Sequence, residues 1–240
     1  MCGIVGYIGG QKASPILLSG LMKLEYRGYD SAGIATLEDG TPTVVKNTGR
    51  VRNLYQDPQL DALTGTVGIA HTRWATHGEP SDVNSHPHST PRVSIVHNGI
   101  IENYGPLKAD LMAKGVTFES ETDTEVLVKL IDYFCCAQPK QSPLEALREA
   151  LAMVRGSYAL GVLFRDEPDT IYAVKKESPL IVGWGEGENF VASDIPALLK
   201  YTRRYSVLEE GDMAVVKADG IRFYLSLIHI SEPTRPEPIS

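Results

Sequence analysis

The second residue of the chain is a cysteine in a position that suits nucleophilic catalysis. Cys2 follows Met1 and precedes the small residue Gly3, a context that favours removal of the initiator methionine. Removal leaves Cys2 with a free α-amine of reference pKa about 7.7–8.0, close to about 8.5 for its thiol, so one residue supplies both nucleophile and general base. With Met1 attached, we expect that base and most activity to be lost. On position alone, the alternative is that Cys2 is a small apolar residue opening a buried strand.

The segment HTRWATHGEP, residues 71–80, gathers side chains that suit a substrate loop. The Arg73 guanidinium can clamp a carboxylate bidentately. Trp74, Thr76 and His77 then lie on a polar, glycine-terminated loop that follows a strand. The alternative is structural, with Arg73 in an ion pair and Trp74 in the core.

The segment RVSIVHNGIIENY, residues 92–104, contains an Asn-Gly pair with two interpretations. Between apolar runs, Asn98 and Gly99 are typical of a type I′ hairpin turn. The functional alternative is an oxyanion hole, in which the side-chain amide of Asn98 and the backbone N–H of Gly99 point at one place. Each such donor lowers the barrier by about 3 kcal/mol.

The segment SETDTEVL, residues 120–127, places Asp123 at the start of a predicted helix. A carboxylate in the first turn stabilises a helix, which is its structural interpretation. Its functional interpretation is to bind a substrate ammonium group. Together with Arg73, which would bind the carboxylate, Asp123 would then recognise an α-amino acid.

Two further patterns are better explained without a ligand. The spacing HPH is not usual for metal ligands, and no cysteine or carboxylate is placed to complete a site, so we expect no metal at the histidines His71, His77, His86 and His88. The segment GWGEGEN, residues 183–189, has Glu188 where a dinucleotide-binding motif requires its third glycine. We therefore expect a hairpin turn there.

The intervening segments predict an α+β protein with mainly antiparallel sheets. Leucines at helical spacing after Pro15 predict one helix. Caps at Thr122 and Ser142 predict two more, and we expect these two to pack on one sheet face. Apolar runs bounded by turn residues predict strands near residues 2–9, 31–37, 43–47, 66–71, 93–97, 158–164, 170–175, 180–184, 189–192, 205–208 and 212–217.

Composition narrows the class of protein. The chain has 240 residues, 42% of them hydrophobic, which is enough for one domain with a substantial core. Its net charge is -7 without basic clusters, which disfavours nucleic acid and anionic membranes as partners. No apolar segment is long enough to span a membrane. Three cysteines, Cys2, Cys135 and Cys136, do not form a disulfide framework, so we expect a cytoplasmic protein.

Six motifs in order resemble the glutaminase domain of the glutamine–fructose-6-phosphate aminotransferases, also called glucosamine-6-phosphate synthases. They are CGIVGYIG at 2–9, LEYRGYDSAG at 24–33, GIAHTRWATHGEP at 68–80, HPH at 86–88, HNGIIEN at 97–103 and SETDTEV at 120–126. The resemblance implies a class II glutamine amidotransferase with the four-layer αββα N-terminal nucleophile (Ntn) hydrolase fold.

The resemblance also implies residue roles and requires no cofactor. Cys2 would attack the side-chain amide of L-glutamine, Asn98 and Gly99 would hold the oxyanion, and Arg73 and Asp123 would bind the substrate's carboxylate and amine. Trp74, Thr76 and His77 would close over glutamine, and Arg27 would order the surroundings of the nucleophile. The products would be glutamate and ammonia, formed through a thioester.

The resemblance covers residues 2–224. We expect residues 225–240, with three prolines, to be a disordered tail outside the family, and the sugar isomerase modules that use fructose 6-phosphate to be absent. Oligomerisation would belong to the full-length enzyme. The alternatives are a glutaminase domain of the phosphoribosyl-pyrophosphate amidotransferase or asparagine synthetase type, and a noncatalytic amino-acid sensor on the same fold.

Overall fold

The computed structural model describes residues 2–74, 79–137 and 141–224, and these form two antiparallel sheets. The first sheet has the order β11-β9-β10-β1-β4-β2-β3 and the second β13-β12-β8-β7-β6-β5. The strands of the first are β1 (Gly3–Ile8), β2 (Ser31–Glu38), β3 (Thr41–Thr48), β4 (Val67–Arg73), β9 (Ile181–Trp184), β10 (Asn189–Ala192) and β11 (Tyr205–Val207). Those of the second are β5 (His88–Ser89), β6 (Val93–Ile101), β7 (Gly156–Phe164), β8 (Glu167–Lys176), β12 (Met213–Lys217) and β13 (Gly220–Tyr224).

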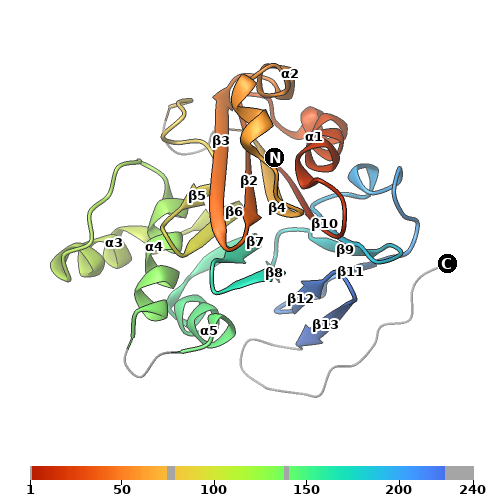
Figure 1. The fold of residues 1–240 in the computed structure, drawn as a ribbon. Helices are drawn as coiled ribbons and strands as arrows, with labels where there is room; N and C mark the ends of the chain where they lie inside the picture. The colour runs from red at the N-terminus through yellow and green to blue at the C-terminus, as the bar shows by residue number, and fades with distance from the viewer. Residues whose placement is uncertain (1, 75–78, 138–140, 225–240) are drawn as a thin grey trace.

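Helices cover the outer faces of the two sheets (Figure 1). Beside the first sheet lie α1 (Ala13–Leu24) and the short α2 (Val51–Tyr55), whose apolar side chains share a cluster with Val5 and Tyr7 of β1. Beside the second lie α3 (Tyr104–Ala113), α4 (Asp123–Cys135) and α5 (Pro143–Met153). Short 3-10 helices lie at Glu25–Arg27, Pro58–Ala62 and Ile195–Ala197.

The inner faces of the sheets pack on each other because side chains alternate along each strand. In β1, Ile4 and Ile8 enter the cluster between the sheets, whereas Val5 and Tyr7 face α1. In β6, Val96 lies between the sheets and Ile95 faces the helices. The result is the four-layer αββα arrangement, which confirms the predicted α+β class.

Local sequence patterns correctly predicted most of the helices and strands. Thr122 accepts a hydrogen bond from the N–H of Glu125, and Ser142 forms a full capping box with Glu145, as the sequence predicted. The turn between β9 and β10, at residues 185–188, lies within the segment 183–189, also as predicted. The α-helices and strands not predicted are α2, α3, β5 and β13. Each is short or lacks a clear apolar periodicity, so packing against neighbours decides its conformation.

Part of the chain lies outside this description. The expectation for the tail at residues 225–240 concerns residues that the structure does not describe. Among those it does describe, no helix has the length and apolar character needed to cross a membrane.

Candidate active site

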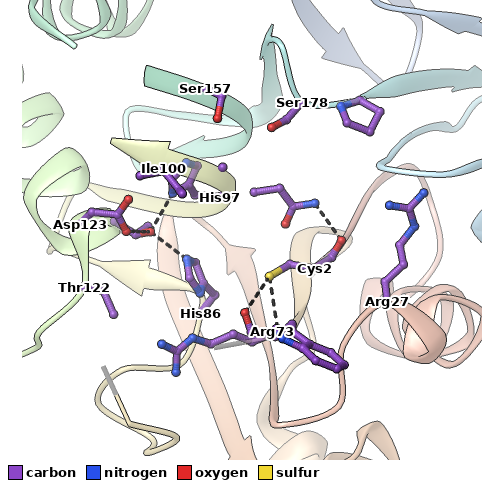
Figure 2. Close-up of a pocket in the computed structure, with 15 residues that line it drawn as sticks. Cys2, Arg27, Arg73, His86, His97, Ile100, Thr122, Asp123, Ser157 and Ser178 are labelled. Atoms are coloured by element: carbon purple, nitrogen blue, oxygen red, sulfur yellow. Dashed lines mark hydrogen bonds between the residues drawn. The ribbon is translucent and has the colours of Figure 1, made fainter. Parts of the chain in front are cut away.

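A cavity of about 260 Å³ opens where the inter-sheet layer ends. Its lining includes the residue before β1, the end of β4, part of β6 and the start of α4. Figure 2 shows Cys2 centrally in this view, with Asp123 on one side and Arg27 on the other. The predicted residues among its lining are Cys2, Arg27, Arg73, Trp74, Asn98, Gly99 and Asp123.

Cys2 lies directly before β1, with its sulfur held by the neighbouring strand. The backbone N–H of Trp74 donates to Sγ at 3.2 Å, and Sγ lies 3.6 Å from the carbonyl oxygen of Trp74. Burial raises the pKa of the Cys2 thiol, and the Trp74 N–H partly opposes that rise. A thiol with a raised pKa is mostly protonated near neutrality, so its use as a nucleophile requires a base.

Asn98 and Gly99 lie inside strand β6 and not in a hairpin turn. They pair with Ala159 and Tyr158 of β7, so the type I′ turn interpretation is wrong: the apolar runs on both sides belong to one continuous strand. Gly99 has φ +134°, and a Cβ there would lie 2.1 Å from the carbonyl oxygen of Ser157. Only glycine fits this position without strain.

The side-chain amide of Asn98 connects the two sheets. Its Nδ2 donates to the carbonyl oxygen of Cys2 at 3.0 Å, and its Oδ1 lies 3.0 Å from Nε2 of His71 on β4. The side-chain amide nitrogen carries two N–H groups, so one is left after the bond to Cys2, and Asn98 lines the cavity.

Arg73 and Trp74 come from the end of β4 but have different environments. Arg73 is 3% exposed and lines the cavity, because it shares the inner face of β4 with Ile69. Trp74 is 48% exposed and makes an edge contact with Tyr29, so its alternative role as a core aromatic is wrong. Thr76 and His77 fall outside the described residues.

Asp123 is the first residue of α4 and is buried at the cavity wall. Its Oδ2 accepts from the backbone N–H of Ile101 at 2.8 Å, and the hydroxyl of Thr124 lies 3.4 Å from its Oδ1. The helix N-terminus also stabilises a negative charge here. This carboxylate is positioned to meet a cationic group in the cavity.

Arg27 is fixed by an acidic residue distant in sequence. Its Nη2 lies 2.6 Å from Oδ2 of Asp194, and its Nε donates to the same oxygen at 3.2 Å. The hydroxyl of Tyr26 also bonds Asp194. Asp194 was not identified from the sequence, since it precedes a single 3-10 turn and belongs to no motif.

Four buried histidines surround the site, and sequence reasoning considered only some of them, as metal ligands. The rings of His71 and His86 lie 4.1 Å apart, and His86 and His97 both lie 2.9 Å from the hydroxyl of Thr124. Burial lowers the pKa of all four, to about 3 for His71 and His88. No group of three ligands suited to a metal occurs within the described segments. His71 and Arg73 are two residues apart in a predicted strand and so share one face. That spacing could have placed His71 next to the site.

The described geometry agrees with comparisons to known proteins. The family model described as "Glutamine amidotransferase domain" matches residues 71–200. The chain belongs to this family. The amidotransferase domain is 56% identical over 225 residues to the glutamine–fructose-6-phosphate aminotransferase (isomerizing) of Caldanaerobacter subterraneus, covering 93% of this chain and 36% of that protein. It is 50% identical over 221 residues to the enzyme of the same name from Pyrococcus horikoshii, covering 91% and 37%.

Solved structures confirm the Ntn hydrolase fold of this amidotransferase domain. The glutamine phosphoribosylpyrophosphate amidotransferase of B. subtilis superposes with a TM-score of 0.81 at 26% identity, covering 95% of this chain and 50% of that one. A glutamine aminotransferase class-II domain protein from Silicibacter pomeroyi, at 18% identity and a TM-score of 0.60, shares the fold. The chain spans little more than a third of the length of its curated relatives.

Proposed function

We propose that this amidotransferase domain hydrolyses L-glutamine to glutamate and ammonia, with Cys2 as nucleophile. The observation that carries the proposal is one cavity lined by Cys2, the Asn98–Gly99 pair, Arg73 and Asp123. A nucleophile, two hydrogen-bond donors, a cation and an anion meet there. That set matches an α-amino acid whose side-chain amide is to be cleaved.

The first half of the reaction forms a thioester. After removal of Met1, the α-amine of Cys2 takes the thiol proton, and the sulfur attacks the side-chain amide carbon of glutamine. The oxyanion of the tetrahedral intermediate accepts from the free Nδ2–H of Asn98 and the N–H of Gly99. The Cys2 ammonium then returns its proton to the amide nitrogen, the C–N bond breaks, and ammonia leaves.

The second half releases glutamate. Water attacks the thioester carbon as the Cys2 amine accepts one of its protons, the C–S bond breaks, and the thiolate is reprotonated. The same two donors stabilise the second oxyanion. Dividing one displacement into two steps lowers each barrier.

Substrate recognition uses the charged groups at the cavity wall. The guanidinium of Arg73 binds the α-carboxylate and Asp123 binds the α-ammonium. Trp74, Thr76 and His77 are proposed to contact bound glutamine, and Arg27, held by Asp194, to order the surroundings of Cys2.

Within the family, we propose the amino-sugar branch. The relatives of 50–56% identity bear the name glutamine–fructose-6-phosphate aminotransferase, whereas the phosphoribosylpyrophosphate enzyme is 26% identical. Residues 2–224 would be the ammonia-producing domain. In a longer protein, ammonia would be passed on to convert fructose 6-phosphate to glucosamine 6-phosphate.

The test combines intact-mass analysis with a glutamate-release assay on one preparation. We expect a mass lacking one methionine, with glutamate and ammonia formed in equal amounts. Cys2→Ala should lower turnover by at least about 10³-fold and leave thermal stability nearly unchanged, since the nucleophile cannot be replaced. Retained turnover in Cys2→Ala would exclude the proposed nucleophile.

Labelling with a glutamine-analogue electrophile distinguishes the proposed enzyme from a noncatalytic sensor. An enzyme should incorporate one label at Cys2 and lose activity in proportion to labelling. Saturable glutamine binding without turnover, in a chain whose mass shows a free N-terminal Cys2, would support the sensor.

A further inference from the structure

A buried histidine outside the cavity contacts the Asn98 amide. His71 lies on the inner face of β4 and is fully buried. Its Nε2 lies 3.0 Å from Oδ1 of Asn98 and 3.0 Å from the backbone carbonyl oxygen of His97, both on β6. One ring nitrogen of the first sheet therefore meets two oxygens of the second.

These contacts determine which ring nitrogen carries the proton. The carbonyl oxygen of His97 can only accept a hydrogen bond, so Nε2 must be the protonated nitrogen that donates. Nδ1 has no hydrogen-bond partner among the described residues, as fits the unprotonated nitrogen. Burial lowers the pKa of His71 to about 3, so the ring is neutral and carries a single proton.

The protonated Nε2 determines the orientation of the Asn98 amide. Facing an N–H donor, Asn98 must present Oδ1, and Nδ2 is then directed at the carbonyl oxygen of Cys2. The flipped amide would place Nδ2 against an N–H group and Oδ1 against the Cys2 carbonyl, so that both contacts would be repulsive.

We infer that His71 is a positioning residue that holds the amide of Asn98 with its N–H groups directed at Cys2 and the oxyanion. The inference rests on the proposed function, because it assigns a task to the oxyanion donor. His71 does not line the cavity, so it would act on the oxyanion through its contact with Asn98.

Neighbouring side chains hold the imidazole ring in place. The ring of His86 lies against it at 4.1 Å, and His86 is itself bonded to Thr124 of α4. Turning the His71 ring would therefore break its contacts with β6 and disturb His86, which is bonded to α4. This packing gives the donor a fixed direction at no cost during the reaction.

The decisive experiment is a double-mutant cycle on glutamine hydrolysis. His71→Leu should lower kcat about 10-fold, less than the roughly 10²–10³-fold loss expected when an oxyanion donor is removed, with KM changed less than about twofold. In an Asn98→Ala background the same substitution should have almost no further effect. An equal loss in both backgrounds would overturn the inference, since the loss would then not pass through Asn98.

A matched polar pair covers the case in which His71→Leu fails to fold. The amide nitrogen of His71→Gln reaches the position of Nε2, whereas that of His71→Asn falls one atom short. We expect the glutamine variant to keep at least about a third of wild-type kcat and the asparagine variant to behave like His71→Leu. Equal activity of the two variants would contradict the inference.

A control substitution and a direct readout complete the test. Asn189 is another buried side chain, whose Nδ2 donates to the carbonyl of Lys217 in β12; Asn189→Leu should lower stability and leave kcat within about twofold. In NMR spectra, the side-chain amide protons of Asn98 should exchange with water faster in His71→Asn than in His71→Gln. That readout needs no turnover, so an inactive wild type would refute the proposed function while the inference is still tested.

Discussion

The layer between the two sheets is apolar over most of its length and polar at one end. In β4 the inward residue Ile69 belongs to the apolar cluster, and the next two inward residues on the same strand are His71 and Arg73. In β6, Val96 is followed on the same face by Asn98. The inward-facing residues of the same two strands therefore contribute both to the core and to the candidate site.

The two parts of this layer differ in how strictly they fix the directions of their side-chain contacts. The apolar part is stabilised by burial, which is roughly proportional to area and tolerates changes of detail. At the polar end each buried group requires a partner at a fixed angle, and those partners come from other elements. We therefore expect substitutions in the apolar part to change stability, and substitutions at the polar end to change stability and turnover together.

The largest effect on stability is expected at Gly99. Gly99→Ala places a Cβ 2.1 Å from a backbone oxygen at a φ of +134°, so the free energy of unfolding should fall by about 3–5 kcal/mol, with turnover largely lost. Urea denaturation and the glutamate assay measure both. The control is Gly105→Ala in α3, where a Cβ meets nothing within 4 Å and stability should rise by up to about 1 kcal/mol. Similar changes in stability for the two variants would show that the close contact and positive φ at Gly99 do not require glycine.

The apolar part is tested at Ile171 in β8, which is fully buried between the sheets. Ile171→Ala should lower the free energy of unfolding by about 3 kcal/mol through lost burial and a residual cavity. Because Ile171 does not line the catalytic cavity, kcat/KM should stay within about twofold when measured well below the melting temperature. A loss of kcat/KM as large as that of Gly99→Ala would show that the two regions are not separable.

The same contrast explains what the sequence could predict. Strand alternation, leucine spacing and the caps at Thr122 and Ser142 are local, and they predicted the class and most elements. Asn98 and Gly99 had two local interpretations, and the choice depended on whether β6 continues, which pairing with β7 decides. The partners of the site residues, Asp194 for Arg27 and His71 for Asn98, lie 167 and 27 residues away. No local pattern in the sequence reports such contacts.

Buried histidines near the site make the fold sensitive to acid. His88 has a pKa of about 3, chiefly because of burial, with Lys46 lowering it further and Glu125 opposing. The unfolded chain binds a proton near pH 6.5 and the folded chain does not, so stability is lost as pH falls below 6.5. Between pH 7 and pH 5 each such histidine should lower the free energy of unfolding by about 2 kcal/mol.

His88→Gln isolates this contribution. Removing one titrating group should reduce the difference in stability between pH 7 and pH 5 by about 2 kcal/mol relative to wild type, whatever the variant does to stability at pH 7. Urea midpoints at the two pH values provide the measurement. Parallel pH profiles for wild type and variant would mean that His88 is not buried as a neutral group.

The smallest effect is expected at α5, which packs on the outer face of the second sheet and does not line the cavity. Ser142 caps this helix by accepting from the N–H of Glu145, so Ser142→Ala should lower the free energy of unfolding by about 1 kcal/mol. Ser142→Thr keeps the hydroxyl and should recover most of that loss. Turnover should be unchanged in both variants, because no residue of α5 lines the cavity. A change in kcat with either variant would show that the outer layer, and not only the polar end, positions the catalytic groups.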